Sequence, residues 1–174
     1  MHFVFMGVSG SGKSSIARPV AERLGFAFAE ADEFHPPANI AAMSAGIPLT
    51  DEDRLPWLHA LAGWIADREA AGEHSVMACS ALRRCYRDVL RSGAPDVRFL
   101  HPAGPRELIG ERLAGRSGHF MPAGLLDSQY ATLEPLQPDE AGRTLDVSRT
   151  VEELIEEAAG LVRAALAGEG GARS

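Results

Sequence analysis

The chain has 174 residues, of which 45% are hydrophobic and 24% are charged, and this composition is ordinary for a globular protein with a buried core. Its formal net charge of −7 repels nucleic-acid backbones and anionic lipid surfaces, so neither is expected as a partner. No apolar stretch approaches the roughly 20 residues that span a bilayer. The N-terminal residues lack the pattern of a signal peptide, and the two cysteines lack metal-ligand spacing. Together these features predict a cytoplasmic protein.

Short apolar runs alternate with longer helical patterns along the whole chain. The runs predict five strands, at 2–6, 26–30, 75–79, 97–100 and 144–147. The helical patterns lie at 13–24, in a short stretch up to 44, from 51 to a turn at 72, at 80–91, at 105–115, at about 125–133 and at about 151–166. Such alternation predicts an α/β fold with a five-stranded parallel sheet covered by helices on both faces. Ligands of such sheets bind beyond the carboxyl ends of the strands.

Several helix ends carry sequence signals. Gly25 is expected to end the first helix, and the acidic residues after Thr50 favour a helix start, with Pro56 in the first turn. Ser80 is expected to cap the helix that runs to residue 91. Thr150, followed three residues later by a glutamate, forms a capping-box pattern for the last helix.

Neither an internal repeat nor a linker interrupts this pattern, so residues 1–174 are interpreted as a single domain. Pro19 lies inside the first predicted helix and is expected to kink it or to remove one of its hydrogen bonds. The glycine-rich residues 168–174 are expected to form a disordered tail.

The most specific motif follows the first strand, where residues 7–14 match G-x-x-x-x-G-K-[ST] at every fixed position. The place of this motif between a predicted strand and a predicted helix is typical of a phosphate-binding loop. The glycines let backbone N–H groups turn toward phosphates, and the helix N-terminus adds its positive end. Lys13 is expected to reach the β- and γ-phosphates, and Ser14 to ligate Mg²⁺. The residues expected to bind ATP here are Gly7, Ser9, Gly10, Ser11, Gly12, Lys13, Ser14 and Ser15.

Two sequence features disfavour other classes of phosphate-loop protein. The strand at 75–79 ends in Cys79, without the acidic residue that a motor or transporter ATPase carries there. No N-K-x-D-like guanine motif is present, which disfavours a GTPase. A small-molecule kinase remains.

Two carboxylates follow the second strand and are expected to face the active-site crevice. Asp32 could accept the proton of an attacking hydroxyl and orient it toward the γ-phosphate. Glu30 could hold Mg²⁺ through a water molecule. The alternative is that residues 30–33 form an ordinary acidic loop, and the sequence alone leaves this open, most of all for Glu30.

Beyond the phosphate loop, the sequence resembles the gluconate kinase family of P-loop kinases in segments that cover most of the chain. These segments include Glu30-x-Asp32-x-x-His35-Pro36, Asn39-Ile40, Met43-Ser44-x-Gly46-x-Pro48-Leu49-x-Asp51-x-Asp53-Arg54-x-Pro56-Trp57-Leu58, Ala78-Cys79-Ser80-Ala81-Leu82-Arg83-Arg84-x-Tyr86-Arg87-Asp88, Gly118-His119-Phe120-Met121 and Leu125-Leu126-x-Ser128-Gln129-Tyr130-x-Thr132-Leu133-Glu134. The chain departs slightly from the family pattern, with Ser15 where threonine is usual and Arg83 where lysine is common.

The resemblance implies an adenylate-kinase-like, three-layer P-loop kinase fold with a small lid at about 116–124. The implied reaction converts D-gluconate and ATP, with Mg²⁺, to 6-phospho-D-gluconate and ADP. The family is commonly homodimeric. D-gluconate would then be the small-molecule substrate.

A polyhydroxy acid requires both hydroxyl acceptors and a partner for its carboxylate. Asp32 and His35 could take hydroxyls, while Arg54 and Arg83 offer the bidentate fork that suits a carboxylate. Ser80 lies beside them at a strand end. Alternatively, Arg54 forms only a surface ion pair. Arginines also recur at helical spacing after Ser80, at Arg83, Arg84, Arg87 and Arg91. Such a stripe is typical of a solvated face, so Arg87 and Arg91 are assigned to the surface.

Four residues around the implied lid complete the candidate site. Arg116 would neutralise charge on the transferring phosphoryl group, and Arg112 would stack on adenine, as the family's fold suggests. Either arginine could instead only satisfy the dipole at a helix C-terminus. His119 could reach the substrate when a lid closes, although it could equally be an ordinary loop residue. Gln129 is a weaker substrate-binding candidate, since it could be only a helix surface group.

Three other interpretations remain. Shikimate kinase would show a Gly-Gly-Gly turn after the third strand, where this chain has Cys79-Ser80-Ala81. A nucleoside monophosphate kinase would carry a longer lid and an arginine-rich monophosphate pocket. A nucleotide-binding regulator without catalysis is disfavoured, because a dead enzyme tends to lose one of four residues that are intact here, namely Lys13, Ser14, Asp32 and Arg116.

Overall fold

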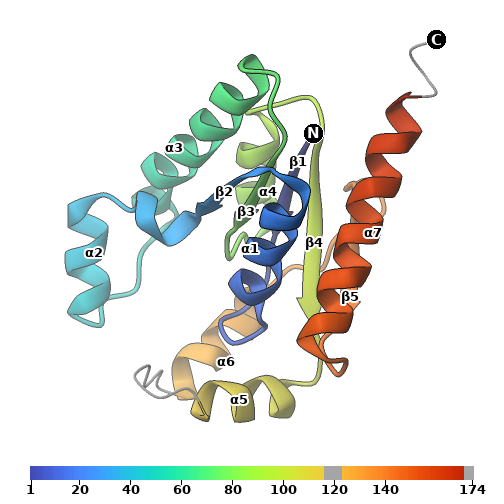
Figure 1. Cartoon of the computed structure of the whole chain (residues 1–174). Helices are drawn as coiled ribbons and strands as arrows, with labels where there is room; N and C mark the ends of the chain where they lie inside the picture. The colour runs from blue at the N-terminus through green and yellow to red at the C-terminus, as the bar shows by residue number, and fades with distance from the viewer. Residues whose placement is uncertain (116–122, 171–174) are drawn as a thin grey trace.

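A five-stranded sheet lies at the centre of the computed structural model, which describes residues 1–115 and 123–170 (Figure 1). The strands are β1 (His2–Phe5), β2 (Ala27–Glu30), β3 (Ser75–Ala78), β4 (Val97–Ala103) and β5 (Gly142–Asp146), in the spatial order β2-β3-β1-β4-β5. Every pairing is parallel. The carboxyl ends of all these strands therefore meet at one edge.

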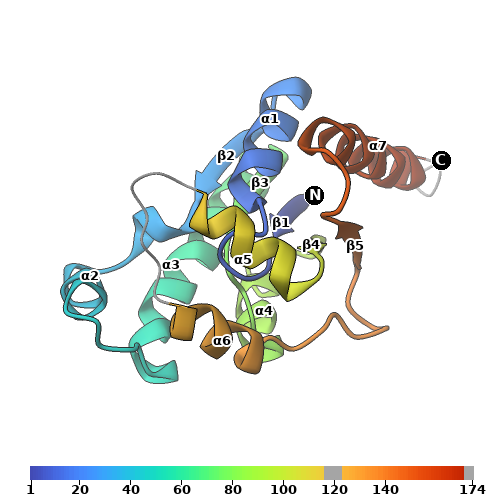
Figure 2. The same cartoon turned by 90° about the horizontal axis from the view of Figure 1, so that it is seen from below.

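Helices cover both faces of the sheet, which confirms the predicted three-layer α/β fold. Their bounds are α1 (Lys13–Leu24), α2 (Pro37–Ser44), α3 (Asp51–Ala70), α4 (Arg84–Arg91), α5 (Arg106–Ala114), α6 (Ala123–Thr132) and α7 (Val151–Gly170), with the 3-10 helix η1 (Ala31–Phe34) after β2. Figure 2 shows α1 and α7 on one side of the strands and α3 and α4 on the other. It also shows α5 and α6 across the end toward which the strands run.

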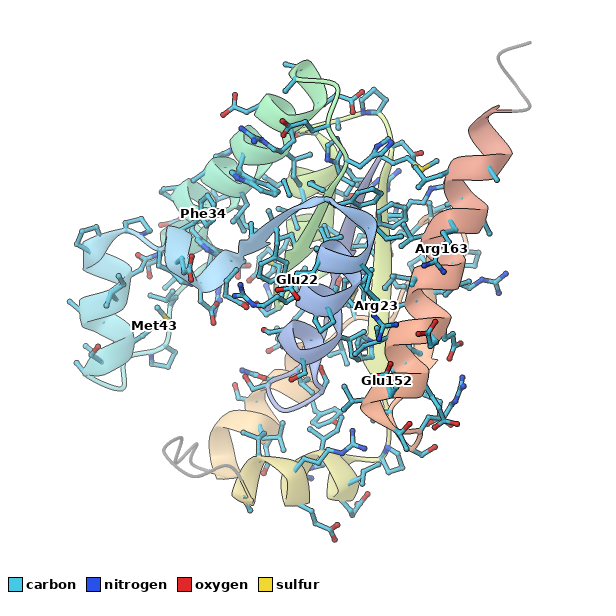
Figure 3. All side chains as sticks on the ribbon, in the orientation of Figure 1. Glu22, Arg23, Phe34, Met43, Glu152 and Arg163 are labelled. Carbon is cyan, nitrogen blue, oxygen red and sulfur yellow. The ribbon has the colours of Figure 1, made fainter. Side chains whose placement is uncertain are left out.

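Successive side chains of the first strand point alternately into the two hydrophobic cores, one on each face of the sheet. Phe3 and Phe5 pack with α1 and α7, while Val4 and Met6 pack with α3 and α4. A strand buried on both faces reads as a continuous apolar run, and this is why the first residues predict a strand so clearly. At the outer rim, the guanidinium Nη2 of Arg23 lies 2.6 Å from the carboxylate of Glu152 and joins α1 to α7 (Figure 3).

Most predicted helix ends are confirmed, with two corrections. Gly25 ends α1 in the left-handed conformation at φ 69°, and Thr50 forms a capping box with Asp53. That box starts α3 at residue 51, so Pro56 lies deeper in the helix than the predicted first turn. Ser80 does not cap α4, because the chain runs on through a turn with Ala81 at φ 40° and the helix begins only at residue 84.

The ends of the other elements differ modestly from prediction. The predicted capping box at Thr150 is confirmed by its reciprocal hydrogen bonds with Glu153. Helix α1 continues through Pro19 to residue 24 as one helix. Helix α7 continues to residue 170, so the expected tail at 168–174 starts inside this helix, and residues 171–174 lie outside the described part of the chain. No helix in residues 1–115 and 123–170 is long and apolar enough to cross a membrane.

Arg87 is buried, and its assignment to the solvated face is wrong. Both Arg87 and Glu140 have fully buried side chains, and their guanidinium and carboxylate meet through Nε–Oε1 at 2.6 Å and Nη2–Oε2 at 2.8 Å. The remaining donors reach backbone carbonyls at 3.1–3.4 Å. These carbonyls belong to Ala81, Leu82, Glu134 and Pro135. The Arg87 guanidinium group thus links α4 to the loop after β3 and to the segment before β5.

Replacing Arg87 with methionine should destabilise the protein by about 3–5 kcal/mol, because Glu140 would be left buried without its partner. Urea unfolding measures this change. Arg91→Met is the matched control, since Arg91 is partly exposed and its ion pair among the described residues is with Asp88 at 3.5 Å. This substitution should change stability by about 0.5 kcal/mol or less. Equal losses in the two variants would contradict the structural role of Arg87.

Candidate active site

The phosphate loop joins β1 to α1 and lies close against β4 and α5. Gly7 and Gly10 have positive φ angles of 132° and 81°. A Cβ atom at Gly10 would lie 2.6 Å from the side chain of Leu113 in α5, and one at Gly7 would lie 3.0 Å from the ring of His101 in β4. Both the backbone conformation and the close approach therefore require glycine at these positions.

The end of this loop opens α1, as predicted. Gly12 is the residue before the helix, at φ 90°, and Lys13 is its first residue. The Lys13 ammonium group donates to the carbonyl of Val8 at 2.9 Å, which folds the side chain back along the loop. Ser14 and Ser15 follow in the first turn, and the buried hydroxyl of Ser11 has no hydrogen-bond partner among the described residues.

The two predicted carboxylates lie next to this helix start. The Ser14 hydroxyl donates to Glu30. Burial raises the pKa of the Glu30 carboxyl, the Ser14 hydrogen bond opposes that shift, and the nearby charge of Asp32 adds to it. Asp32 is exposed in η1, and the Trp57 indole fixes this short helix by donating to the Ala31 carbonyl at 2.7 Å. The structure thus brings Lys13, Ser14, Glu30 and Asp32 together.

His35 lies against the core rather than in the open crevice. Its ring stacks on that of Trp57, with centroids 4.3 Å apart and planes 12° apart, and only 9% of the residue is exposed. Asn39 lies 3.5 Å from the imidazole and donates to the Asp53 carbonyl at 2.8 Å. Burial lowers the pKa of His35, and the nearby Arg54 charge lowers it further while Asp32 opposes this. The ring therefore favours its neutral form.

Two predicted carboxylate partners, Arg54 and Arg83, lie around one aromatic ring. The Arg54 guanidinium carbon lies 5.9 Å from the ring centroid of Tyr86. Arg83 is the residue before α4 and reaches Asp51 at 2.5 Å. Ser80 connects this region to the phosphate loop, because its carbonyl accepts from the Gly7 N–H at 3.0 Å.

Gln129 makes a contact that the sequence analysis missed. Its carboxamide oxygen accepts from the Ser9 N–H at 2.7 Å, and its NH₂ group donates to the Ser9 hydroxyl at 3.1 Å. Helix α6 therefore touches the phosphate loop directly. No local pattern could have indicated this pair, because 120 residues separate its members.

Arg112 is the one remaining candidate of this group that lies in the described part of the chain. Arg112 in α5 donates to the carbonyl of Val147, just after β5, at 2.6 Å. Its expected stacking on adenine stays a prediction. Arg116 and His119 lie outside the described residues, as does most of the expected lid.

The chain has relatives among known proteins. A family model described as an AAA domain matches residues 3–136. A curated gluconokinase from Gluconobacter oxydans is 49% identical over 137 residues, which cover 79% of this chain and 77% of the relative. The chain belongs to the gluconokinase family. The stretch matched by the family model, residues 3–136, contains all the residues predicted to bind phosphate or substrate.

Two solved structures extend the family comparison to three dimensions. An unliganded sugar kinase from Janibacter sp. HTCC2649 is 60% identical, with a TM-score of 0.85 over 90% of this chain and 91% of that chain. A gluconokinase from Sinorhizobium meliloti 1021 is 48% identical, with a TM-score of 0.82 over 93% of this chain and 91% of that one. The P-loop kinase fold expected from the resemblance to the gluconokinase family is thereby confirmed.

His101 is a buried titratable residue directly beneath the loop of this gluconokinase-family member. It lies in β4, and its ring is adjacent to Gly7. Burial lowers the pKa of His101 to about 4, and the positive charges of Arg87 and Lys13 contribute. The imidazole is therefore neutral at neutral pH.

His101 should make the fold sensitive to acid. Because its folded pKa lies below the unfolded value of 6.5, its contribution is complete above that value and is lost as pH falls toward 4. Between about pH 7 and pH 5, the free energy of unfolding should fall by about 2 kcal/mol more in the wild type than in His101→Gln. Exposed His59→Gln is the control and should keep the wild-type slope. Parallel curves for all three proteins would contradict this role.

Proposed function

We propose that this chain is a gluconokinase, which transfers the γ-phosphoryl group of ATP to the terminal hydroxyl of D-gluconate. The products are ADP and 6-phospho-D-gluconate. The carrying observation is the similarity to curated gluconokinases over most of the chain, together with the gathering of Lys13, Asp32 and the two arginines at one sheet edge. The reaction needs little covalent chemistry from the protein, so positioning and charge do most of the work.

ATP would be held by the backbone N–H groups of the phosphate loop and by Lys13. The residues present also fit Mg²⁺, a hard cation that prefers oxygen ligands. The Ser14 hydroxyl and the Glu30 carboxylate are already hydrogen-bonded to one another at the helix start. Ser14 would ligate the ion directly and Glu30 through water. When bound, Mg²⁺ would neutralise charge on the phosphates.

The substrate would lie between Asp32 and the arginines. Asp32 would orient the attacking hydroxyl and accept its proton, while Arg54 and Arg83 would receive the carboxylate. His35, held neutral by burial, could contact a hydroxyl through its exposed edge. For Arg116, His119 and Arg112 the roles proposed from the family resemblance stand, namely charge neutralisation, substrate contact and adenine stacking.

Assembly and location are also proposals. Homodimer formation rests on the family resemblance, and a monomer mass in sedimentation equilibrium would contradict it. A cytoplasmic location agrees with the two free cysteines, as in reducing compartments. Cell fractionation tests it.

An ADP-release assay with ATP, Mg²⁺ and a panel of D-gluconate, other aldonates, shikimate and AMP tests the proposed reaction. We expect strong turnover with D-gluconate alone. Turnover with another panel member would retain the kinase and replace the substrate. Binding of ATP without ADP release for any member of the panel would instead favour a nucleotide-binding regulator.

Asp32→Asn should lower kcat by about 100-fold or more, because the hydroxyl would lose its proton acceptor. Some rate should survive from positioning and electrostatics. Steady-state kinetics with D-gluconate measures the loss. Glu33→Gln is the matched control, because Glu33 is the exposed neighbouring acid in the same short helix, and it should keep wild-type kcat. Full turnover in Asp32→Asn would rule out Asp32 as the base.

A further inference from the structure

Asp51 joins the start of α3 to the start of α4 through both of its carboxylate oxygens. It is the first residue of α3, directly after the capping Thr50. Oδ2 accepts from Arg83 Nη1 at 2.5 Å, and Oδ1 accepts from the hydroxyl of Tyr86. The two helices lie side by side on the same face of the sheet (Figure 1). Neither contact could be seen from local sequence, since 32 and 35 residues separate the partners.

Tyr86 makes this arrangement rigid. The residue is only 6% exposed, and its ring packs in the core beneath α3 and α4. Burial and the hydrogen bond to Asp51 raise the pKa of Tyr86 to about 12, so the hydroxyl keeps its proton and remains a donor. Arg54, one turn after Asp51 in α3, has its guanidinium carbon 5.9 Å from the centroid of this ring.

Asp51 therefore holds the Arg83 guanidinium group through its Nη1 atom. Among residues 1–115 and 123–170, no hydrogen bond is seen from its Nε or Nη2 atoms, and the side chain is 40% exposed. A long, exposed arginine normally samples many rotamers, and ordering such a side chain opposes binding. An arginine already fixed through one donor, with other donors still open, can meet a carboxylate at lower entropic cost.

We infer that Asp51 is a positioning residue for the acid end of the substrate, acting through Arg83 and Tyr86 rather than by touching the substrate. The inference rests on the proposed function, in which Arg54 and Arg83 bind a carboxylate. Asp51 itself is negative and would repel that carboxylate, so it serves binding only by ordering the two cations beside it. Its effect should appear in substrate affinity and not in phosphoryl transfer.

Steady-state kinetics of Asp51→Asn tests this role, with D-gluconate and ATP varied separately. Asparagine keeps the size of the side chain and an acceptor for Tyr86, but loses the charge that holds Arg83. We expect KM for D-gluconate to rise by about three- to tenfold, the range expected for an unfixed side chain. The kcat and the KM for ATP should stay within about twofold of wild type.

Glu52→Gln is the matched control. Glu52 is the next residue in the first turn of α3, is exposed and has no hydrogen bond or ion pair among the described residues. The substitution removes an equal charge from the same helix N-terminus, and KM for D-gluconate should stay within about twofold of wild type.

Tyr86→Phe is a second test variant, which keeps the aromatic ring beneath Arg54 but removes the hydroxyl that donates to Asp51. The contact between Asp51 and Arg83 remains, so KM for D-gluconate should rise less than in Asp51→Asn. It also keeps the test decisive if Asp51→Asn unfolds.

Three results would overturn the inference. Equal KM values in Asp51→Asn and Glu52→Gln would assign the effect to helix charge alone. A lower KM in Asp51→Asn would show that Asp51 competes with the substrate for Arg83. A fall in kcat at unchanged KM would place Asp51 in the transfer step. Wild-type turnover is measured in the same series, and its absence with D-gluconate would overturn the proposed function itself, and this inference with it.

Discussion

The buried ion pair between Arg87 and Glu140 is the constraint on which the site's architecture depends. A charged pair without solvent is tolerated only when its hydrogen-bonding groups are satisfied, and here the guanidinium has partners at every nitrogen. Those partners fix the turn at Ala81 and Leu82, which leads into Arg83. They also fix the segment after α6. The position of Arg83, a candidate substrate-binding residue, is thus set by the buried guanidinium group of Arg87, which is not itself a candidate for binding the substrate.

Charge is distributed unevenly around the phosphate loop. The chain as a whole is acidic, at −7, yet cations gather at the carboxyl edge of the sheet. Two buried titratable side chains beneath the loop are neutral at neutral pH, because burial raises the pKa of the Cys79 thiol to about 12 and lowers that of His101 to about 4. Neither therefore adds a charge that would compete with Lys13 and the α1 N-terminus for anions in the loop.

The sequence predicts well those features that depend on neighbouring residues. The phosphate loop, the strand–helix alternation, the Gly25 helix end and the Thr150 capping box all follow from local chemistry, and each is present in the structure. Prediction failed where a distant segment decided the outcome. Helical spacing shows that Arg87 belongs to a stripe, but not that a loop 53 residues later covers it. The predicted helix cap at Ser80 failed for the same reason, since the Ser80 carbonyl is bound by the phosphate loop. The contact between Gln129 and Ser9 was not predicted, because 120 residues separate the two.

The order of strands has a consequence for how the protein is made. β1 is the first strand of the chain and the middle strand of the sheet, paired with β3 on one side and β4 on the other. Its pairing with both neighbouring strands can therefore be complete only after about a hundred residues of the chain have been synthesised, and such non-local pairing slows folding. The phosphate loop takes its position from β1. The working shape of the phosphate loop thus depends on strands that are synthesised well after it.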